Sequence, residues 1–107
     1  MRRGQIYRVH EPSGDTKRQR CFVIVSRQVL IESSYATVVC APIFTNGTGL
    51  STQVPVGPDE GFKHHSWIVC DNLRSMRKSD LTHFVGSLSE PQLDRLNDAL
   101  RIALALE

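Results

Sequence analysis

Two segments that are apolar at almost every position limit most strongly how this chain can fold. Residues 21–25 read Cys-Phe-Val-Ile-Val and residues 36–41 read Ala-Thr-Val-Val-Cys-Ala, so both are rich in β-branched side chains. Short uninterrupted runs of this kind are typical of strands that are buried on both faces of a sheet. Because 107 residues suffice for one domain, we expect these two strands at the centre of a single sheet.

Other segments have weaker strand patterns, with alternating or apolar side chains bounded by clusters of turn formers. Pro55 lies in one of them and favours an edge of the sheet, because proline has no N–H to donate to a neighbouring strand. Pro42 is expected where the strand over 36–41 ends. The weaker segments are residues 5–9, 53–56, 66–70 and 83–88.

The hydrophobic period changes near the C-terminus. Ser89 and Gln92 have the spacing of a capping box, and Pro91 lies in the first turn, where its missing N–H does no harm. Apolar residues then recur every three or four positions, which places one apolar stripe along a helix that packs on the sheet. The stripe comprises Leu93, Leu96, Leu100, Ala103 and Leu104. The sequence therefore predicts a mainly β fold with a C-terminal helix, arranged as a small barrel.

The composition excludes several classes of protein. Hydrophobic residues make up 40% and charged residues 22% of the chain, as in an ordinary globular domain. No apolar stretch is long enough to span a bilayer, and no apolar signal core follows the basic N-terminus, so the cytoplasm is the expected location. Cys21, Cys40 and Cys70 are widely spaced and odd in number, which argues against a disulfide framework. Cys40 and Cys70 are expected in the core.

Common catalytic and metal-binding motifs are also missing. No Cys-x-x-Cys and no histidine pair at ligand spacing occurs, so no metal site is expected. Gly-x-Ser-x-Gly and phosphate-binding glycine-rich loops are absent as well. His64 and His65 could supply a general acid, although adjacent histidines in a polar loop more often face solvent.

The charge is distributed unevenly. The net charge is only +2, from 13 basic and 11 acidic residues. The N-terminal part, however, carries many cations against Glu11 and Asp15 alone. Such a distribution suits a protein that binds phosphates, and equally a solvated basic loop, so both interpretations stay open. The cations are Arg2, Arg3, Arg8, Lys17, Arg18 and Arg20.

An arginine and a hydroxyl flank the two central strands. Arg20 directly precedes the strand over 21–25, and Thr45 follows shortly after the other strand. If the two strands are neighbours, both side chains lie at one rim of the sheet. A guanidinium group there matches two phosphate oxygens and stabilises charge that develops on them. An arginine before a strand is often merely solvated, so the residues alone indicate this phosphate site only weakly.

Six segments in register resemble the MazF/PemK toxins over essentially the whole chain. They are residues 3–7, 20–26, 37–43, 54–56, 66–75 and 86–88. The resemblance implies a single toxin domain over 1–107 with an SH3-like barrel of the PemK/CcdB type. It also implies a homodimer that cleaves single-stranded RNA at specific sequences, without metal or cofactor. An acidic antitoxin would neutralise this endoribonuclease and join it in binding operator DNA.

The resemblance also assigns site residues. Arg20 matches the family's catalytic arginine, although Cys21 follows it where the family usually has proline. The family's catalytic hydroxyl directly follows Pro-Ile; here Phe44 stands in that place, so Thr45 becomes the candidate. Phe44 itself either packs in the core or stacks on a base. The expected substrate-binding residues are Lys17, Arg18, Phe44, Asn46, Asp71 and Asn72.

Two other functions remain open. A CcdB-like gyrase inhibitor shares this barrel, but it relies on a C-terminal Trp-Gly-Ile where this chain has Ala105, Leu106 and Glu107. A non-catalytic SH3-like module that only binds nucleic acid is the other alternative. Phe44 at the usual hydroxyl position keeps that alternative open.

Overall fold

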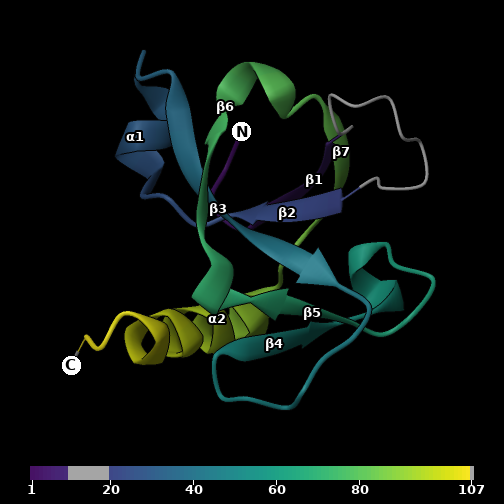
Figure 1. Ribbon diagram of the computed structural model, residues 1–107. Coiled ribbons are helices and arrows are strands. Elements are labelled where there is room, and N and C mark those ends of the chain that lie inside the picture. Colours follow the sequence, from purple (N-terminus) through teal and green to yellow (C-terminus); the bar gives the residue numbers. More distant parts are fainter. Residues whose placement is uncertain (10–19, 107) are drawn as a thin grey trace.

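A computed structural model describes residues 1–9 and 20–106 of the chain, which form one curved antiparallel sheet and a C-terminal helix (Figure 1). The strand order is β4-β5-β3-β2-β1-β7, and β6 pairs with β3 beside β5. β4 therefore lies at an edge, as Pro55 indicated. The strands are β1 (Gln5–Val9), β2 (Arg20–Ile24), β3 (Thr37–Phe44), β4 (Gln53–Val56), β5 (Ser66–Val69), β6 (Arg74–Arg77) and β7 (His83–Ser87).

Short helices connect the strands, and one long helix closes the chain. The long helix α2 (Glu90–Ala103) lies against β4 and β5 in Figure 1. The others are α1 (Gln28–Glu32), η2 (Pro58–Glu60), η3 (Cys70–Asn72) and η4 (Lys78–Asp80). No helix within the described residues has the length and apolar character that a membrane crossing requires.

β3 organises the sheet because it has different partners along one of its edges. β2 pairs along one side, whereas the other side pairs first with β6, at Cys40, and then with β5, at Ile43 and Phe44. Pro42 lies within β3 and does not end it, which corrects the expectation from the sequence. The backbone N–H and C=O of Val39 point toward β2. Because the backbone groups of successive residues in a strand point to alternate sides, the nitrogen of Pro42 points to the other side, toward the gap between β6 and β5. Its missing N–H costs no ladder hydrogen bond there.

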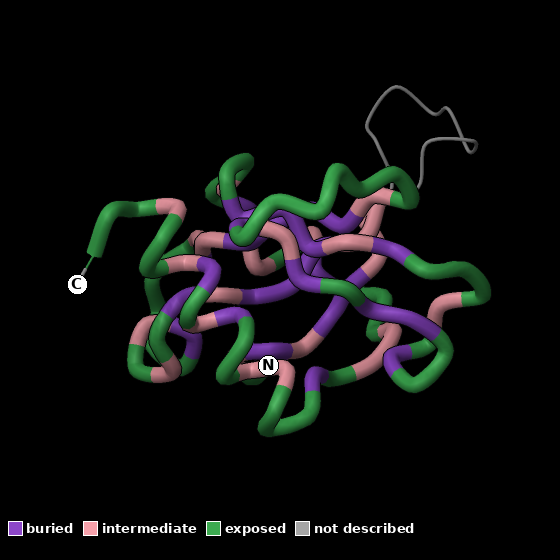
Figure 2. The backbone as a smooth tube through the Cα atoms, turned by 90° about the horizontal axis from the view of Figure 1, so that it is seen from below, coloured by how far each residue is buried: buried purple, intermediate pink, exposed green. Residues whose placement is uncertain are grey.

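The sheet is covered on both faces, so most residues of the central strands β2 and β3 are buried (Figure 2). Val23 of β2 and Leu96 of α2 belong to one cluster, which we call the α2 core. Phe22 of β2 and Ile31 of α1 belong to the other, the α1 core. The α1 core comprises Tyr7, Phe22, Ile24, Ile31, Val38, Cys40, Met76 and Leu81. Side chains of β2 alternate between the two cores, as the continuous apolar pattern predicted.

Helix α2 begins as the sequence predicts. The Ser89 side chain accepts a hydrogen bond from the backbone N–H of Gln92, and the Gln92 side chain accepts one from the N–H of Ser89. Leu96 is fully buried. Leu104, in contrast, caps the helix and is 52% exposed, so its assignment to the buried stripe was wrong.

Candidate active site

Arg20 and Phe44 lie together where the two central strands meet the rim. The register pairs Cys21 with Ile43, which brings Arg20 and Phe44 opposite each other on the α1-core face. The guanidinium carbon of Arg20 lies 5.2 Å from the centroid of the Phe44 ring. This cation–π contact, together with the strand that starts at Arg20, restricts where the guanidinium can point. The prediction that Arg20 opens β2 at the rim is confirmed.

Trp67 of β5 is the next residue in line with Arg20 and Phe44 across the sheet. It pairs with Phe44 in the register of β3 and β5. Phe44 is half-buried and belongs to neither core cluster. One side of its ring faces Arg20. The sequence alone did not point to Trp67, because its place depends on the pairing of distant strands.

Thr45 and Asn46 follow β3 directly and are exposed. They lie at the end of β3 that neighbours the start of β2, so Thr45 and Arg20 share one rim as expected. The loop after them covers Trp67, since a Cβ at Gly47 would overlap the indole ring. Two hydrogen bonds hold the loop: the N–H of Thr48 donates to Gln53 Oε1 (2.9 Å), and Gln53 Nε2 donates to Thr48 Oγ1 (3.1 Å).

Gly47→Ala tests whether this loop matters for activity. The added methyl group has to displace either the loop or the indole, so we expect turnover to fall about 10-fold, equivalent to one lost hydrogen bond to a charged group. Global stability should change by less than about 1 kcal/mol, because the loop is exposed. Gly49→Ala is the matched control, since its added Cβ meets nothing within 4 Å and costs only the backbone strain of φ +73°. Equal activity of both variants would show that the loop position is unimportant.

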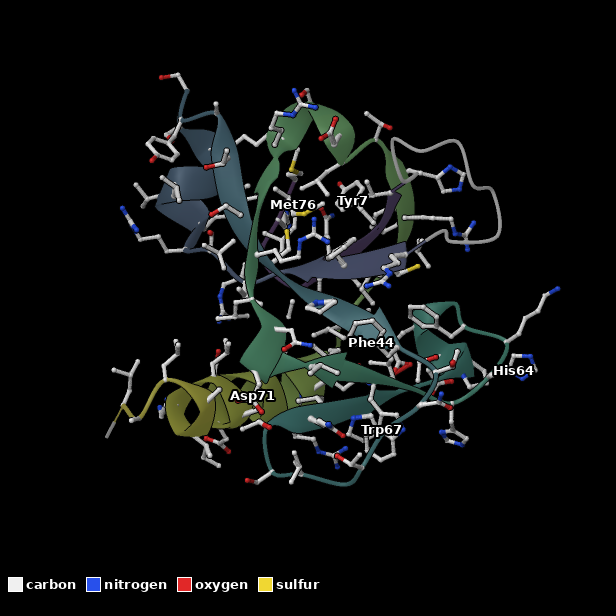
Figure 3. The ribbon with its side chains drawn as sticks, viewed as in Figure 1. Tyr7, Phe44, His64, Trp67, Asp71 and Met76 are labelled. Carbon is white, nitrogen blue, oxygen red and sulfur yellow. The ribbon has the colours of Figure 1, made fainter. Side chains whose placement is uncertain are left out.

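The other predicted binding residues are distributed over the molecule. Lys17 and Arg18 lie outside the described residues. Asp71 and Asn72 are exposed in η3, which follows the opposite end of β5 from Trp67. Figure 3 shows Asp71 near α2, away from Phe44. Asp71 Oδ2 accepts a 2.6 Å hydrogen bond from Thr52 Oγ1. The structure thus does not bring this pair beside Arg20, and their contact with RNA stays a prediction.

Arg3 is used within the fold. Its Nε donates to the carbonyl of Val25 (3.0 Å), and its terminal nitrogen donates to Asn97 Oδ1 on α2 (2.8 Å). Burial lowers the pKa of this guanidinium. Arg3 therefore joins the N-terminus to α2 and does not belong to the phosphate-binding cations that the charge distribution suggested.

The cysteines and histidines form no catalytic cluster in the described part of the chain. Cys40 and Cys70 are buried as predicted, and burial raises their pKa values to about 12 and about 11, so both stay protonated thiols at neutral pH. Burial also raises the pKa of the Cys21 thiol, while the charge of Arg8 lowers it. His64 and His65 are exposed. Residues 1–9 and 20–106 contain no group of three or more His, Cys, Asp or Glu that could hold a metal ion.

A groove of about 400 Å³ adjoins this site on the α1-core face. It lies between the strands β1 and β2 on one side and the segment from β6 to η4 on the other. Arg74 stands at this groove, and its guanidinium carbon lies 5.6 Å from the centroid of the Phe22 ring. Like Trp67, Arg74 was not singled out as a site residue from the sequence, because β6 has no strand pattern.

The curved sheet with its C-terminal helix places the protein among small bacterial toxins of known structure. The Mycobacterium tuberculosis toxin MazF-mt6 superposes with a TM-score of 0.83 at 29% identity, covering 96% of this chain and 98% of that chain. A mycobacterial endoribonuclease in complex with its cognate antitoxin gives a TM-score of 0.85 at 26% identity, covering 100% and 97%. These matches confirm the predicted fold class, which is mainly β with a C-terminal helix, and the sheet forms a half-barrel.

Sequence comparison identifies the family. PemK-like, MazF-like toxins of type II toxin–antitoxin systems match residues 2–104. The chain belongs to this family. It is also 32% identical over 90 residues to endoribonuclease MazF3 of Mycobacterium tuberculosis, and the alignment covers 84% of this chain and 86% of that relative.

Proposed function

We propose that this toxin is an endoribonuclease that cleaves single-stranded RNA at specific sequences without a metal ion or cofactor. The observation that carries the proposal is the guanidinium of Arg20, which Phe44 holds at the rim beside Thr45. The family and the endoribonuclease relatives support the same activity. The active unit is the single domain over 1–107, acting in the cytoplasm, where its RNA substrate occurs.

The nucleophile in this mechanism belongs to the substrate. The 2′-hydroxyl of the RNA loses its proton and attacks the adjacent phosphorus, the bond from phosphorus to the 5′ oxygen breaks, and that oxygen gains a proton. The products are a 2′,3′-cyclic phosphate and a 5′-hydroxyl. Arg20 binds the two non-bridging oxygens and stabilises the charge that grows on them in the transition state. Thr45 donates a hydrogen bond that orients the phosphate, and Asn46, Asp71, Asn72, Lys17 and Arg18 contact the flanking RNA.

The direct test is incubation of purified protein with a long RNA in the presence of EDTA. Cleavage supports the proposal, and mapping the 5′ ends of the fragments gives the recognition sequence. RNA binding without cleavage would favour the non-catalytic module, for which Phe44 at the usual hydroxyl position is the specific observation. Cleavage that EDTA abolishes would exclude the metal-independent mechanism.

Thr45→Ala tests the hydroxyl. We expect turnover to fall about 10-fold, the scale of one hydrogen bond to a charged group, with unchanged stability because Thr45 is exposed. Thr45→Ser should retain most of the activity, since it keeps the hydroxyl. Thr37→Ala, at the other end of β3, is the matched control and should cleave normally. If Thr45→Ala and the control cleave equally fast, Thr45 has no catalytic role.

The proposed partners are a second copy of the chain and an acidic antitoxin, which together with the toxin binds operator DNA. Large apolar side chains that remain exposed, such as Val29, Tyr35 and Ile102, leave surface for a homodimer to bury. An acidic segment of the antitoxin would compete with RNA for the same guanidinium groups. The solved complex of a related endoribonuclease with its antitoxin supports this partner.

Sedimentation velocity at micromolar concentration tests the homodimer. We expect a single species of twice the 12.0 kDa chain mass. The species should persist at high salt, because burial of apolar surface is screened little by ions. A stable 12.0 kDa species would contradict the homodimer while leaving the cleavage chemistry untouched.

A further inference from the structure

Arg74 and Phe22 form a second arginine–aromatic pair on the sheet face that carries Arg20 and Phe44. Phe22 is 2% exposed and fixed in the α1 core, whereas Arg74 is exposed, so its guanidinium rests on an immobile ring at the groove. Arg20 and Phe22 are two residues apart in β2, so their Cα atoms lie about 7 Å apart. The two arginine–aromatic pairs therefore lie one after the other on one face of the sheet. In this arrangement each arginine can bind one of two successive phosphates of an extended nucleic-acid strand.

The groove beside Arg74 has the chemistry of a nucleotide site. Val9, which is partly buried, gives it apolar surface, while Arg74, Asp80 and Thr82 line it with polar groups. Its volume of about 400 Å³ lies within the range of small-molecule sites. A nucleobase combines an apolar face with a polar edge, and its phosphate is an anion. A cationic side chain beside apolar surface can hold such a unit, since the cation binds the phosphate and the apolar surface contacts the base.

We propose that this groove binds the nucleotide next to the scissile phosphate, with its phosphate on Arg74 and its base between Val9 of β1 and Asp80 of η4. The inference rests on the proposed function, because RNA brings this nucleotide to the groove only when Arg20 holds the neighbouring phosphate. It assigns Arg74 as a substrate-positioning residue and Asp80 as a residue that determines sequence specificity.

Asp80 defines which bases fit. Its Oδ2 accepts a 3.2 Å hydrogen bond from Arg77 Nε, and the side chain remains 40% exposed, so the carboxylate can accept a further hydrogen bond. An ionised carboxylate only accepts, so it favours a base edge with an amino group. Cytosine carries an amino group where uracil has a carbonyl oxygen, which the carboxylate repels. The groove therefore selects cytosine over uracil by about 10-fold, the scale of one base-edge contact.

Binding of short 2′-O-methyl oligonucleotides tests the groove separately from cleavage, because they have no 2′-hydroxyl to react. The oligonucleotides differ only by cytosine or uracil at one position. We expect the wild-type protein to bind the cytosine form about 10-fold more tightly. Asp80→Asn should remove the difference, since an amide both donates and accepts. Arg74→Ala should weaken both forms about 10-fold, while Arg95→Ala, which removes one exposed charge from α2, should weaken neither more than about twofold.

Kinetics with cleavable RNA provide the second readout. Arg74→Ala should raise KM about 10-fold and change kcat less, as expected for a group that binds substrate and transition state equally. Wild-type protein that binds but does not cleave would overturn the proposed function and leave the groove assignment standing. The groove assignment is overturned if Asp80→Asn keeps the base preference, or if Arg74→Ala behaves like Arg95→Ala. The groove assignment would also be overturned if an acidic peptide displaces RNA and the protein shows no base preference toward any oligonucleotide.

Discussion

Arg20→Ala is expected to lower the turnover of RNA cleavage by roughly 100-fold or more, the scale of losing one donor to the developing charge. Arg20 lies at the rim, half-buried, with its guanidinium on the Phe44 ring. RNA affinity should fall much less than turnover, because the interaction that is lost forms mainly in the transition state. Single-turnover cleavage of a defined RNA, with binding measured separately, distinguishes the two effects.

The variant needs controls for charge and for folding. Arg101→Ala removes an exposed arginine on α2 that pairs with Asp98 three residues away, and should leave cleavage unchanged. Arg20→Lys should restore little activity, since an ammonium group cannot bridge two phosphate oxygens with the fork geometry of guanidinium. Stability should change by less than about 1 kcal/mol, the upper scale of an exposed cation–π contact. Full cleavage by a folded Arg20→Ala dimer would reassign catalysis to His64 and His65.

Leu96→Ala is expected to destabilise the protein by about 3 kcal/mol, through lost burial and the cavity that remains. Leu96 is fully buried where α2 packs on the sheet. For a chain of this size the melting temperature should fall by on the order of 10 °C, which thermal unfolding followed by circular dichroism measures. The loss has a functional consequence, because the sheet whose rim carries Arg20 and Thr45 packs on α2.

Leu104→Ala is the matched control on the same helix. The substitution is chemically identical, but Leu104 caps α2 and is 52% exposed, so the change in unfolding free energy should stay within about 0.5 kcal/mol. A loss as large as that of Leu96→Ala would mean that the end of α2 is covered in solution. A loss below 1 kcal/mol for Leu96→Ala would contradict the packing of α2 on the sheet.

Local patterns in the sequence were enough to predict most elements. The capping box at Ser89 and Gln92 is present, and β4 lies at the edge that Pro55 favoured. Cys40 and Cys70 are buried in apolar surroundings as expected. These features depend on residues that are close in sequence or on the chemistry of one side chain, so they can be recognised without knowledge of the fold.

Elements that lack such a pattern were missed. α1 is a single short turn, and only Met76 of β6 is buried, so neither has a recognisable period. β3 runs beyond its expected end because Pro42 faces a gap between two partner strands. Whether a proline interrupts a strand depends on what its nitrogen faces, and that is set by pairing with strands far along the chain.

The sequence by itself determined the fold class, the family and the position of Arg20 at the start of a buried strand. Only the tertiary structure decided which groups Arg20 meets. The register of β2 and β3 places Arg20 against Phe44. Asp71, in contrast, lies in η3, which follows the end of β5 opposite to Trp67. In the folded protein the Arg3 side chain also donates hydrogen bonds to Val25 and Asn97. The physical reason is that a strand pattern specifies which face a side chain takes, while its neighbours across the sheet depend on long-range pairing.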